Sequence, residues 1–314
     1  MEKNLKHSGT RSTEVCQREI DHAVFAREAA EEGIVLLKNE GLLPLKKDTK
    51  IALLGIGAEK TIKGGTGSGD VNNRESVSIY AGMKEKNAGI VSEEWLKDYH
   101  NRYEQARTEW KEQILEAAKH VDNPFDAYAA NPFAMPDGRA VTNEDIEAAE
   151  AAVYVISRIS GEGKDRRKRK GDYYLSDQEE KDLYFLNEQK IPTVLIINAG
   201  GPVELTDLLA GTENICAILN ISQLGQRGGL ALANVLLGKV TPGGKLTATW
   251  ARRYEDYPCA EEYSYLNGKL EREEYKEGIY TGYRYFDTFG VKPLFPFGYG
   301  LSYTEMQIRF HGMK

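Results

Sequence analysis

The sequence predicts an α/β fold in which a mostly parallel sheet is sandwiched between helices. Three short apolar runs rich in β-branched residues, at 153–156, 193–198 and 215–221, have the length and composition of buried strands. Each run is followed by a polar or glycine-rich loop and then by a segment with helical spacing of its apolar residues. Strand–loop–helix units repeated in this way place parallel strands in one sheet with helices on both faces.

The other elements are expected at intervals that continue the alternation. Asp21 is a suitable N-cap for a helix over 21–38, and a strand is expected at 51–55. Ser176 and Glu179 form a capping box at the start of the helix that follows the central strand. The remaining expected elements are helices at 76–86, 93–121, 142–151, 204–210 and 229–237, and strands at 89–91 and within 240–250.

The two ends of the chain differ from its middle. Residues 1–20 are polar and are expected to form a flexible leader, and residues 21–314 to form one α/β domain. The segment 257–303 is crowded with tyrosine and phenylalanine. We expect it to wrap the sheet as an aromatic-rich arm. Core packing is favoured for most of its rings over a carbohydrate-stacking surface.

Composition excludes several classes of protein. The chain has 314 residues, a formal net charge of −7 and a pI near 5.5, whereas a general nucleic-acid-binding protein is usually basic. No apolar run approaches the roughly 18 residues of a transmembrane helix, and the N-terminus lacks the apolar core of a secretory signal. The cysteines and histidines are scattered without metal-ligand spacing. We expect a soluble, cytoplasmic protein with no metal and no cofactor.

The loop after the central strand is the first candidate site. It places Glu162 between Gly161 and Gly163. In open α/β sheets ligand sites lie just beyond the carboxyl ends of the strands, and flanking glycines leave a carboxylate unobstructed. From composition alone, a solvated loop acid is the plainer interpretation of Glu162. In the cationic run that follows, 164–170, Asp165 and Arg166 can pair and fix the loop, and a solvated run is favoured over a nucleic-acid site.

A second glycine-rich loop, KGGTGSGD at 63–70, follows an earlier strand. Its spacing matches neither the phosphate-binding P-loop nor the dinucleotide fingerprint. Glycine there is instead suited to a close approach of the backbone to a neutral polar ligand such as a sugar. Candidate ligand-contacting residues are Gly65, Gly67, Gly69 and Asp70.

Five blocks of sequence, in order, resemble the C-terminal catalytic domain of family 3 glycoside hydrolases. They are FAREAAEEGIVLLKNEGLLPL, GGTGSGDVN, YVISRISGEGKDR with GDYYLS, GQRGGLALANVLLGKVTPGGKL and EGIYTGYRYFDTFGVKPLFPFGYGLSYT. In the fourth block Arg227 stands where an acidic residue is more common. The resemblance implies a six-stranded α/β sandwich, with Glu162 as general acid/base. Asp165, Arg166 and the residues named in the glycine loop are further candidates for contact with substrate.

The same resemblance predicts a missing partner. Enzymes of this family take their nucleophile, an aspartate that typically precedes tryptophan, from a (β/α)8 barrel domain. No Asp-Trp pair and no set of eight βα units occurs in this sequence. Because retaining hydrolysis needs two carboxylates, we expect the leading half of an enzyme with swapped domain order. It would act on a β-linked oligosaccharide or glycoside with a barrel supplied in cis or in trans. The alternative is a non-catalytic carbohydrate-binding or protein-interaction module.

Overall fold

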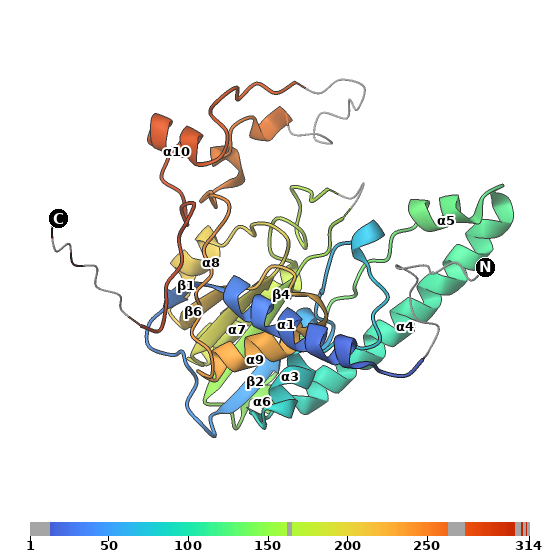
Figure 1. Ribbon diagram of the computed structural model, residues 1–314, viewed down its shortest axis with the longest axis horizontal. Helices are drawn as coiled ribbons and strands as arrows, with labels where there is room; N and C mark the ends of the chain where they lie inside the picture. The colour runs from blue at the N-terminus through green and yellow to red at the C-terminus, as the bar shows by residue number, and fades with distance from the viewer. Residues whose placement is uncertain (1–12, 162–164, 263–273, 305–308, 310–311, 313–314) are drawn as a thin grey trace, which may run out of the picture.

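The computed structural model describes residues 13–161, 165–262, 274–304, 309 and 312. Its centre is a six-stranded sheet with the strand order β1-β6-β5-β4-β2-β3 (Figure 1). All neighbouring strands are parallel except β1, which runs antiparallel to β6. The expected mostly parallel sheet is therefore confirmed. The strands are β1 (Val35–Asn39), β2 (Lys50–Leu54), β3 (Gly89–Ile90), β4 (Ala151–Ser157), β5 (Thr193–Asn198) and β6 (Ile215–Asn220).

Helices flank this sheet. One layer, in front of the sheet in Figure 1, contains α1, α3 and α9, which contact one another, while α7 packs against β4. A long helix, α4, carries α5 away from the sheet on the side opposite to α10 (Figure 1). The bounds are α1 (Gln17–Gly33), α2 (Ile56–Glu59), α3 (Ile79–Glu85), α4 (Glu93–Ala117), α5 (Pro124–Ala130), α6 (Asn143–Ile146), α7 (Asp177–Glu188), α8 (Thr206–Gly211), α9 (Gly228–Leu236) and α10 (Tyr283–Phe289).

The start of the chain differs from the prediction. The first helix begins at Gln17, inside the expected leader, and ends at Gly33, and 34–38 are not helical. The end of the segment expected to be helical instead forms β1, where Leu36 and Leu37 are fully buried. This strand pairs with β6 and also forms an isolated bridge to the C-terminal segment. Long-range pairing, which local periodicity does not report, decides its conformation.

Two further elements were predicted wrongly. The helix expected at 142–151 is only the single turn α6, because the chain enters β4 at Ala151. The segment 240–250 forms an isolated bridge at Trp250 rather than a strand. The backbone of Gly244 passes so close to residue 34 that an added Cβ would lie 2.6 Å from the Ile34 carbonyl oxygen. The segment thus packs closely on the residues that precede β1, to which the N–H of Gly244 donates at 3.1 Å.

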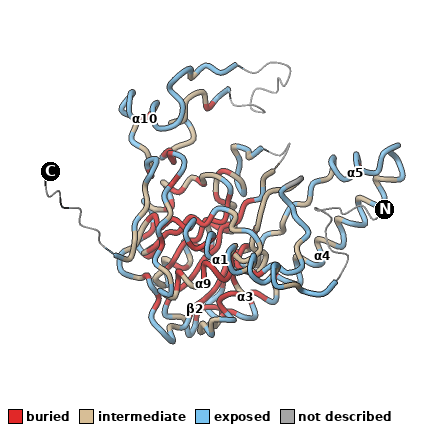
Figure 2. Tube along the Cα trace, viewed as in Figure 1, coloured by how far each residue is buried: buried red, intermediate tan, exposed pale blue. Residues whose placement is uncertain are grey.

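The core consists of the sheet and its covering helices. All seven residues of β4 are buried, and the buried positions are concentrated in this body of the molecule (Figure 2). Helices α3 and α9 cross at very short range, since a Cβ on Gly229 would lie 2.0 Å from the carbonyl oxygen of Ser78. Glycine is required there because no side chain fits. Helices α3 and α9 therefore pack closely against each other in this layer.

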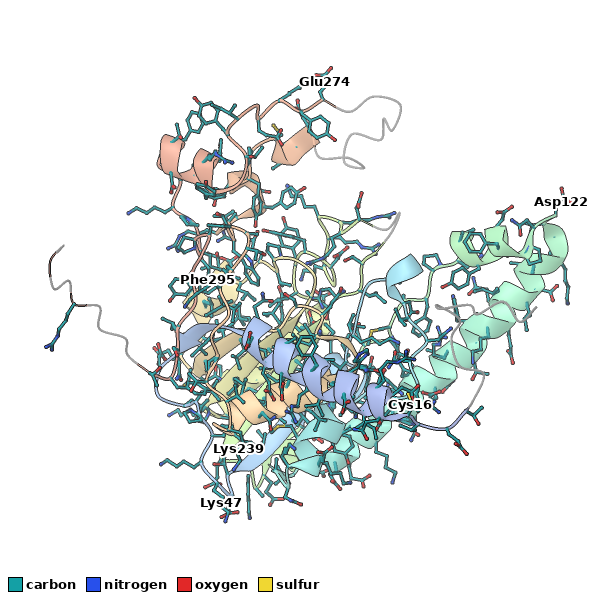
Figure 3. The ribbon with its side chains drawn as sticks, viewed as in Figure 1. Cys16, Lys47, Asp122, Lys239, Glu274 and Phe295 are labelled. Atoms are coloured by element: carbon teal, nitrogen blue, oxygen red, sulfur yellow. The ribbon has the colours of Figure 1, made fainter. Side chains whose placement is uncertain are left out.

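The expected aromatic-rich arm is present, in the described residues 257–262 and 274–303, but most of its rings are not in the core. Figure 3 shows Phe295 beside the sheet and Glu274 at the far end of the arm. Phe286 and Phe295 are buried, whereas Tyr275 is 85 % and Phe289 is 56 % exposed. The prediction that most of these rings pack in the core is therefore wrong for the described part of the arm. Phe295 belongs to the core and Tyr299 and Tyr303 pack against it, whereas the exposed rings Tyr280 and Phe289 contact each other.

Within the described residues, no helix is both long enough and apolar enough to cross a membrane.

Candidate active site

The carboxyl ends of β4 and β5 are joined by a polar centre. Ser157 Oγ donates to Asn198 Oδ1 at 2.8 Å, and the Asn198 amide also bonds both the N–H and the carbonyl of Ile62. The same amide donates to the carbonyl of Ser222 at 2.7 Å. Asn198 thereby holds the loops after β2 and β6 at one edge of the sheet. Sequence reasoning missed this residue, although a polar side chain that ends an apolar strand was the available signal.

The two glycine-containing loops lie side by side at this edge, where each follows a parallel strand. Thr66 and Gly161 form a parallel bridge, and the N–H of Thr66 donates to the carbonyl of Ser160 at 3.0 Å. A Cβ on Gly161 would lie 2.3 Å from the Thr66 carbonyl oxygen, and one on Gly65 would lie 2.7 Å from that of Ser160. These glycines are therefore required by the contact between the loops.

The rest of the second loop lies outside the cavity described below. Gly67 and Gly69 belong to a single 3₁₀ turn, in which Gly67 has a φ of 84°. The Asp70 carboxylate lies 3.7 Å from the Lys63 ammonium. Gly65, Gly67, Gly69 and Asp70 are not among the residues that line the cavity. Their expected contact with substrate remains a proposal.

A cavity of about 860 Å³ opens beside the loop after β4. Glu162 lies outside the described residues, but the chain before and after it lines the cavity at Gly161 and Asp165. Arg166 and the turn Gly200–Pro202 form part of the same wall. The aromatic lining consists of Tyr173, Tyr254, Tyr257, Tyr283, Phe286 and Phe297.

The aromatic lining combines buried and exposed rings. Tyr173 is buried and packs edge-to-face on Tyr254 at a centroid distance of 5.0 Å, while Tyr283 stacks on the exposed Phe297 at 5.1 Å. Burial raises the pKa of both Tyr173 and Tyr257, so that their phenols stay neutral. The cavity thus offers ring faces and neutral hydroxyl groups. This is a surface suited to an uncharged ligand with apolar faces.

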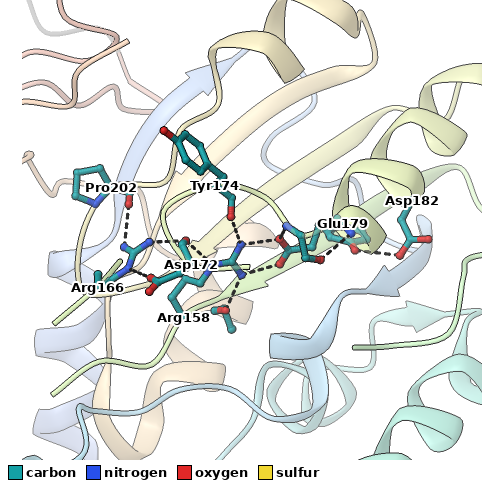
Figure 4. A network of polar contacts seen from close by, with 10 residues as sticks. Arg158, Arg166, Asp172, Tyr174, Glu179, Asp182 and Pro202 are labelled. Atoms are coloured by element: carbon teal, nitrogen blue, oxygen red, sulfur yellow. Dashed lines mark hydrogen bonds and ion pairs between the residues drawn. The ribbon is translucent and has the colours of Figure 1, made fainter. Parts of the chain in front are cut away.

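Two arginines brace the loop that carries Glu162 (Figure 4). Arg158 forms a bidentate pair with Glu179, at 2.7 and 2.6 Å, and both residues are buried. Burial by itself would lower the pKa of Arg158, but the hydrogen bonds and the charge of Glu179 outweigh this effect. The pKa is therefore raised overall, and the guanidinium stays charged. Glu179 also accepts from the N–H of Ser176 at 2.8 Å, which confirms the predicted capping box. The ion pair to Arg158 was missed.

The predicted pair between Asp165 and Arg166 is wrong, because the carboxylate partner of Arg166 is Asp172. Arg166 Nε donates to Asp172 Oδ1 at 2.7 Å. Its Nη1 donates to the carbonyls of Gly201 and Pro202 at 3.1 and 2.8 Å. The turn of the loop brings Asp172 to Arg166, which the distance between them along the sequence did not indicate.

The two lysines of the cationic run that the structure describes form ion pairs with acidic side chains. Lys168 lies 2.6 Å from Glu255 and 3.3 Å from Glu261, and Lys170 bonds Glu180 at 2.9 Å. Two of the cations of this run are therefore paired with acids of the same chain. Across the described residues, no group of three or more histidine, cysteine or acidic side chains is arranged to hold a metal ion.

Comparison with known proteins supports the resemblance seen in the sequence. Residues 34–303 match the glycosyl hydrolase family 3 C-terminal domain. The chain is 35 % identical to beta-glucosidase A of Butyrivibrio fibrisolvens over 309 residues, which cover 90 % of this chain and 35 % of that protein. It is 32 % identical to a beta-glucosidase of Ruminococcus albus, over 94 % of this chain and 30 % of that one.

The fold is also found among solved structures. Beta-glucosidase 3B from Thermotoga neapolitana in complex with glycerol superposes with a TM-score of 0.76 at 38 % identity, covering 93 % of this chain and 40 % of that one. The chain thus spans about a third of the length of the curated relatives it matches. From its five sequence blocks, its six-stranded sheet and these matches, the chain belongs to glycosyl hydrolase family 3, as the C-terminal domain.

Proposed function

We propose that this chain supplies the general acid/base for retaining hydrolysis of β-glucosides, with Glu162 as that group. The observation that carries the proposal is the position of its neighbours. Gly161 and Asp165, the described residues on either side of the segment, both line the aromatic cavity at the carboxyl edge of the sheet. The beta-glucosidase names of the relatives support the substrate class. A (β/α)8 barrel, in cis or in trans, supplies the nucleophile.

The proposed reaction has two steps. In the first, a carboxylate of the barrel attacks the anomeric carbon, and protonated Glu162 donates its proton to the glycosidic oxygen as the bond to the leaving group breaks. In the second, the Glu162 carboxylate removes a proton from water, which attacks the glycosyl-enzyme and releases the sugar with retained configuration. Such chemistry requires the two carboxyl groups about 5–5.5 Å apart.

The cavity beside the loop is the proposed site for the portion of the substrate that departs. Its rings can stack on the apolar faces of a sugar or on an aryl group. Asp165, at its wall, is proposed to accept a hydrogen bond from a substrate hydroxyl. Gly65, Gly67, Gly69 and Asp70 are proposed to form the adjoining wall once the barrel encloses the sugar.

The decisive experiment measures hydrolysis of β-glucosides by the chain alone and with the barrel domain of a family 3 β-glucosidase, mixed or fused. The chain alone is expected to be inactive, because an acid without a nucleophile forms no glycosyl-enzyme. In the restored enzyme, Glu162→Gln should lower turnover of unactivated glucosides by about 10²–10⁴-fold. Activated aryl glucosides should lose less in the first step, since their leaving groups need no proton.

A second measurement identifies the step. With Glu162→Ala and an activated substrate, added azide should accelerate turnover and yield a β-glucosyl azide, because azide attacks the glycosyl-enzyme without a general base. Glu188→Gln, at the distant end of α7, serves as the matched control and should behave as the wild type. Hydrolysis by the chain alone that survives Glu162→Gln would overturn the proposal. Binding of glucosides without turnover in any barrel fusion would favour the binding-module alternative.

A further inference from the structure

The loop between β4 and α7 is anchored by an arginine that has no donor left for a ligand. A guanidinium has five N–H donors, and Arg158 directs all of them to its own chain. Nε donates to the carbonyl of Asp172 at 2.7 Å, Nη1 to that of Ser157 at 2.8 Å, and Nη2 to that of Tyr174 at 3.2 Å. The other two donors bind Glu179. Arg158 therefore joins the outgoing strand, the returning loop and the first turn of α7.

Asp172 connects this anchor to the other end of the loop. Its carbonyl accepts from both Arg158 Nε and Arg166 Nη2, at 2.7 and 2.6 Å. Its carboxylate accepts from Arg166 Nε and from the backbone N–H of Arg167, both at 2.7 Å. The Arg166 and Asp172 side chains are only 15 % and 16 % exposed. Asp172 thus accepts four hydrogen bonds, which together link residues 166–167 to the buried Arg158.

The chain is held on both sides of the acid/base segment. On the near side Gly161 is fixed by its bridge to Thr66, and on the far side Arg166 is fixed by Asp172 and by the carbonyls of Gly201 and Pro202. Four of the five Arg166 donors are used in this way, so its main role is not to bind substrate.

We infer that Asp172 is a positioning residue of the hydrolytic reaction. Acting through Arg166 and Arg167, it holds in place the described chain that follows the segment containing Glu162. The inference rests on the proposed function of Glu162. We therefore expect Asp172 variants to be impaired in proton donation. A misplaced acid slows hydrolysis most for substrates whose leaving group must be protonated.

The test is Asp172→Asn in the barrel-complemented enzyme. This change removes the carboxylate charge but keeps the backbone carbonyl that Arg158 and Arg166 share. We expect kcat/KM for an alkyl β-glucoside to fall about tenfold to a hundredfold, while a dinitrophenyl β-glucoside loses much less. Asp172→Glu should restore part of the difference. Lys170→Ala, which removes two exposed ion pairs from the same loop, is the control and should leave the ratio of the two substrates unchanged.

Two further results complete the test. In the chain without the barrel, Asp172→Asn should speed tryptic cleavage after Arg166 and Arg167, followed by mass spectrometry, relative to Lys170→Ala. An equal loss on both substrates, or no loss, would overturn the inference while leaving the role of Glu162 intact. An inactive wild-type complex would overturn the proposed function, and the inference with it. Because the substrate ratio does not depend on the fraction of folded protein, partial unfolding cannot imitate the expected result.

Discussion

The sheet, rich in aliphatic side chains, and the arm, rich in aromatic ones, bury them to very different degrees. Leu53 and Val155 of the sheet are completely inaccessible, whereas Tyr275 of the arm is 85 % exposed. Ring pairs such as Tyr280 with Phe289 form in the arm without removal from solvent. Since burial is the main source of stability, the sheet body holds the fold together. The arm presents the kind of exposed apolar surface that marks an interaction site, which suits the proposed barrel partner.

The largest expected effect lies in the body. Glu179→Gln leaves the buried guanidinium of Arg158 without its counter-charge, which should lower the free energy of unfolding by about 3–5 kcal/mol. The measurement is urea denaturation followed by circular dichroism. Glu180→Gln is the matched control, because its pair with Lys170 is exposed, and its midpoint should hardly move. Equal midpoints for the two variants would show that the buried ion pair contributes no more to stability than the exposed one.

An intermediate effect is expected inside the arm itself. Phe286 is 2 % exposed and Phe297 is 52 % exposed, although both line the cavity. Phe286→Ala should cost about 3 kcal/mol because it opens a hole against Tyr257, whereas Phe297→Ala should cost less than about 0.5 kcal/mol. Thermal unfolding and hydrogen exchange of the arm report the difference. A larger loss of stability for Phe297→Ala than for Phe286→Ala would contradict the prediction. It would mean that Phe297 is packed more tightly in solution than its exposed fraction indicates.

The smallest effect concerns pH. Asp182 is buried against β4, and burial raises its pKa even though Val141 N–H, Gln178 and the Tyr154 hydroxyl donate to it. An acid with a raised folded pKa takes up its proton more readily when folded. Wild-type stability should therefore rise relative to Asp182→Asn as pH falls from this raised value towards the unfolded value near 3.9. The three hydrogen bonds offset much of the burial, which keeps the effect small.

An acid at the base of the arm should show the opposite sign. The bond from Arg253 lowers the pKa of Asp207, so its contribution to stability is lost as pH falls towards the lowered value. Melting temperatures of wild type, Asp182→Asn and Asp207→Asn, taken from pH 3 to 7, compare the two directly. Curves that run parallel for all three proteins would contradict both assignments.

Local signals in the sequence predicted the parts of the structure that depend on local physics. The buried strands β4, β5 and β6 were visible as β-branched runs, and the capping box of Ser176 and Glu179 lies where its spacing placed it. The meeting of the two glycine loops was also predictable, because both follow parallel strands that end at one edge.

Features that depend on distant contacts were not predictable. Residues 35–37 were expected to continue the first helix, yet the partners of this segment are β6 and the C-terminal segment, so they form a strand. The ion pair of Arg158 joins residues 21 positions apart, and Arg166 selects Asp172 over its neighbour. The exposure of the arm could not be predicted, because aromatic composition does not distinguish rings in a core from rings on an exposed surface.

The bridge between Leu36 and Leu301 has a consequence for how such a domain is combined with others. The N–H of Leu301 donates to the carbonyl of Leu36 at 2.7 Å, so that the first strand of the family-matched region meets its last residues at one sheet edge. A unit that closes on itself in this way tolerates circular permutation and insertion, since entry and exit share one location. Gene rearrangement can therefore place it before or after a companion domain and still leave its sheet and active-site edge unchanged.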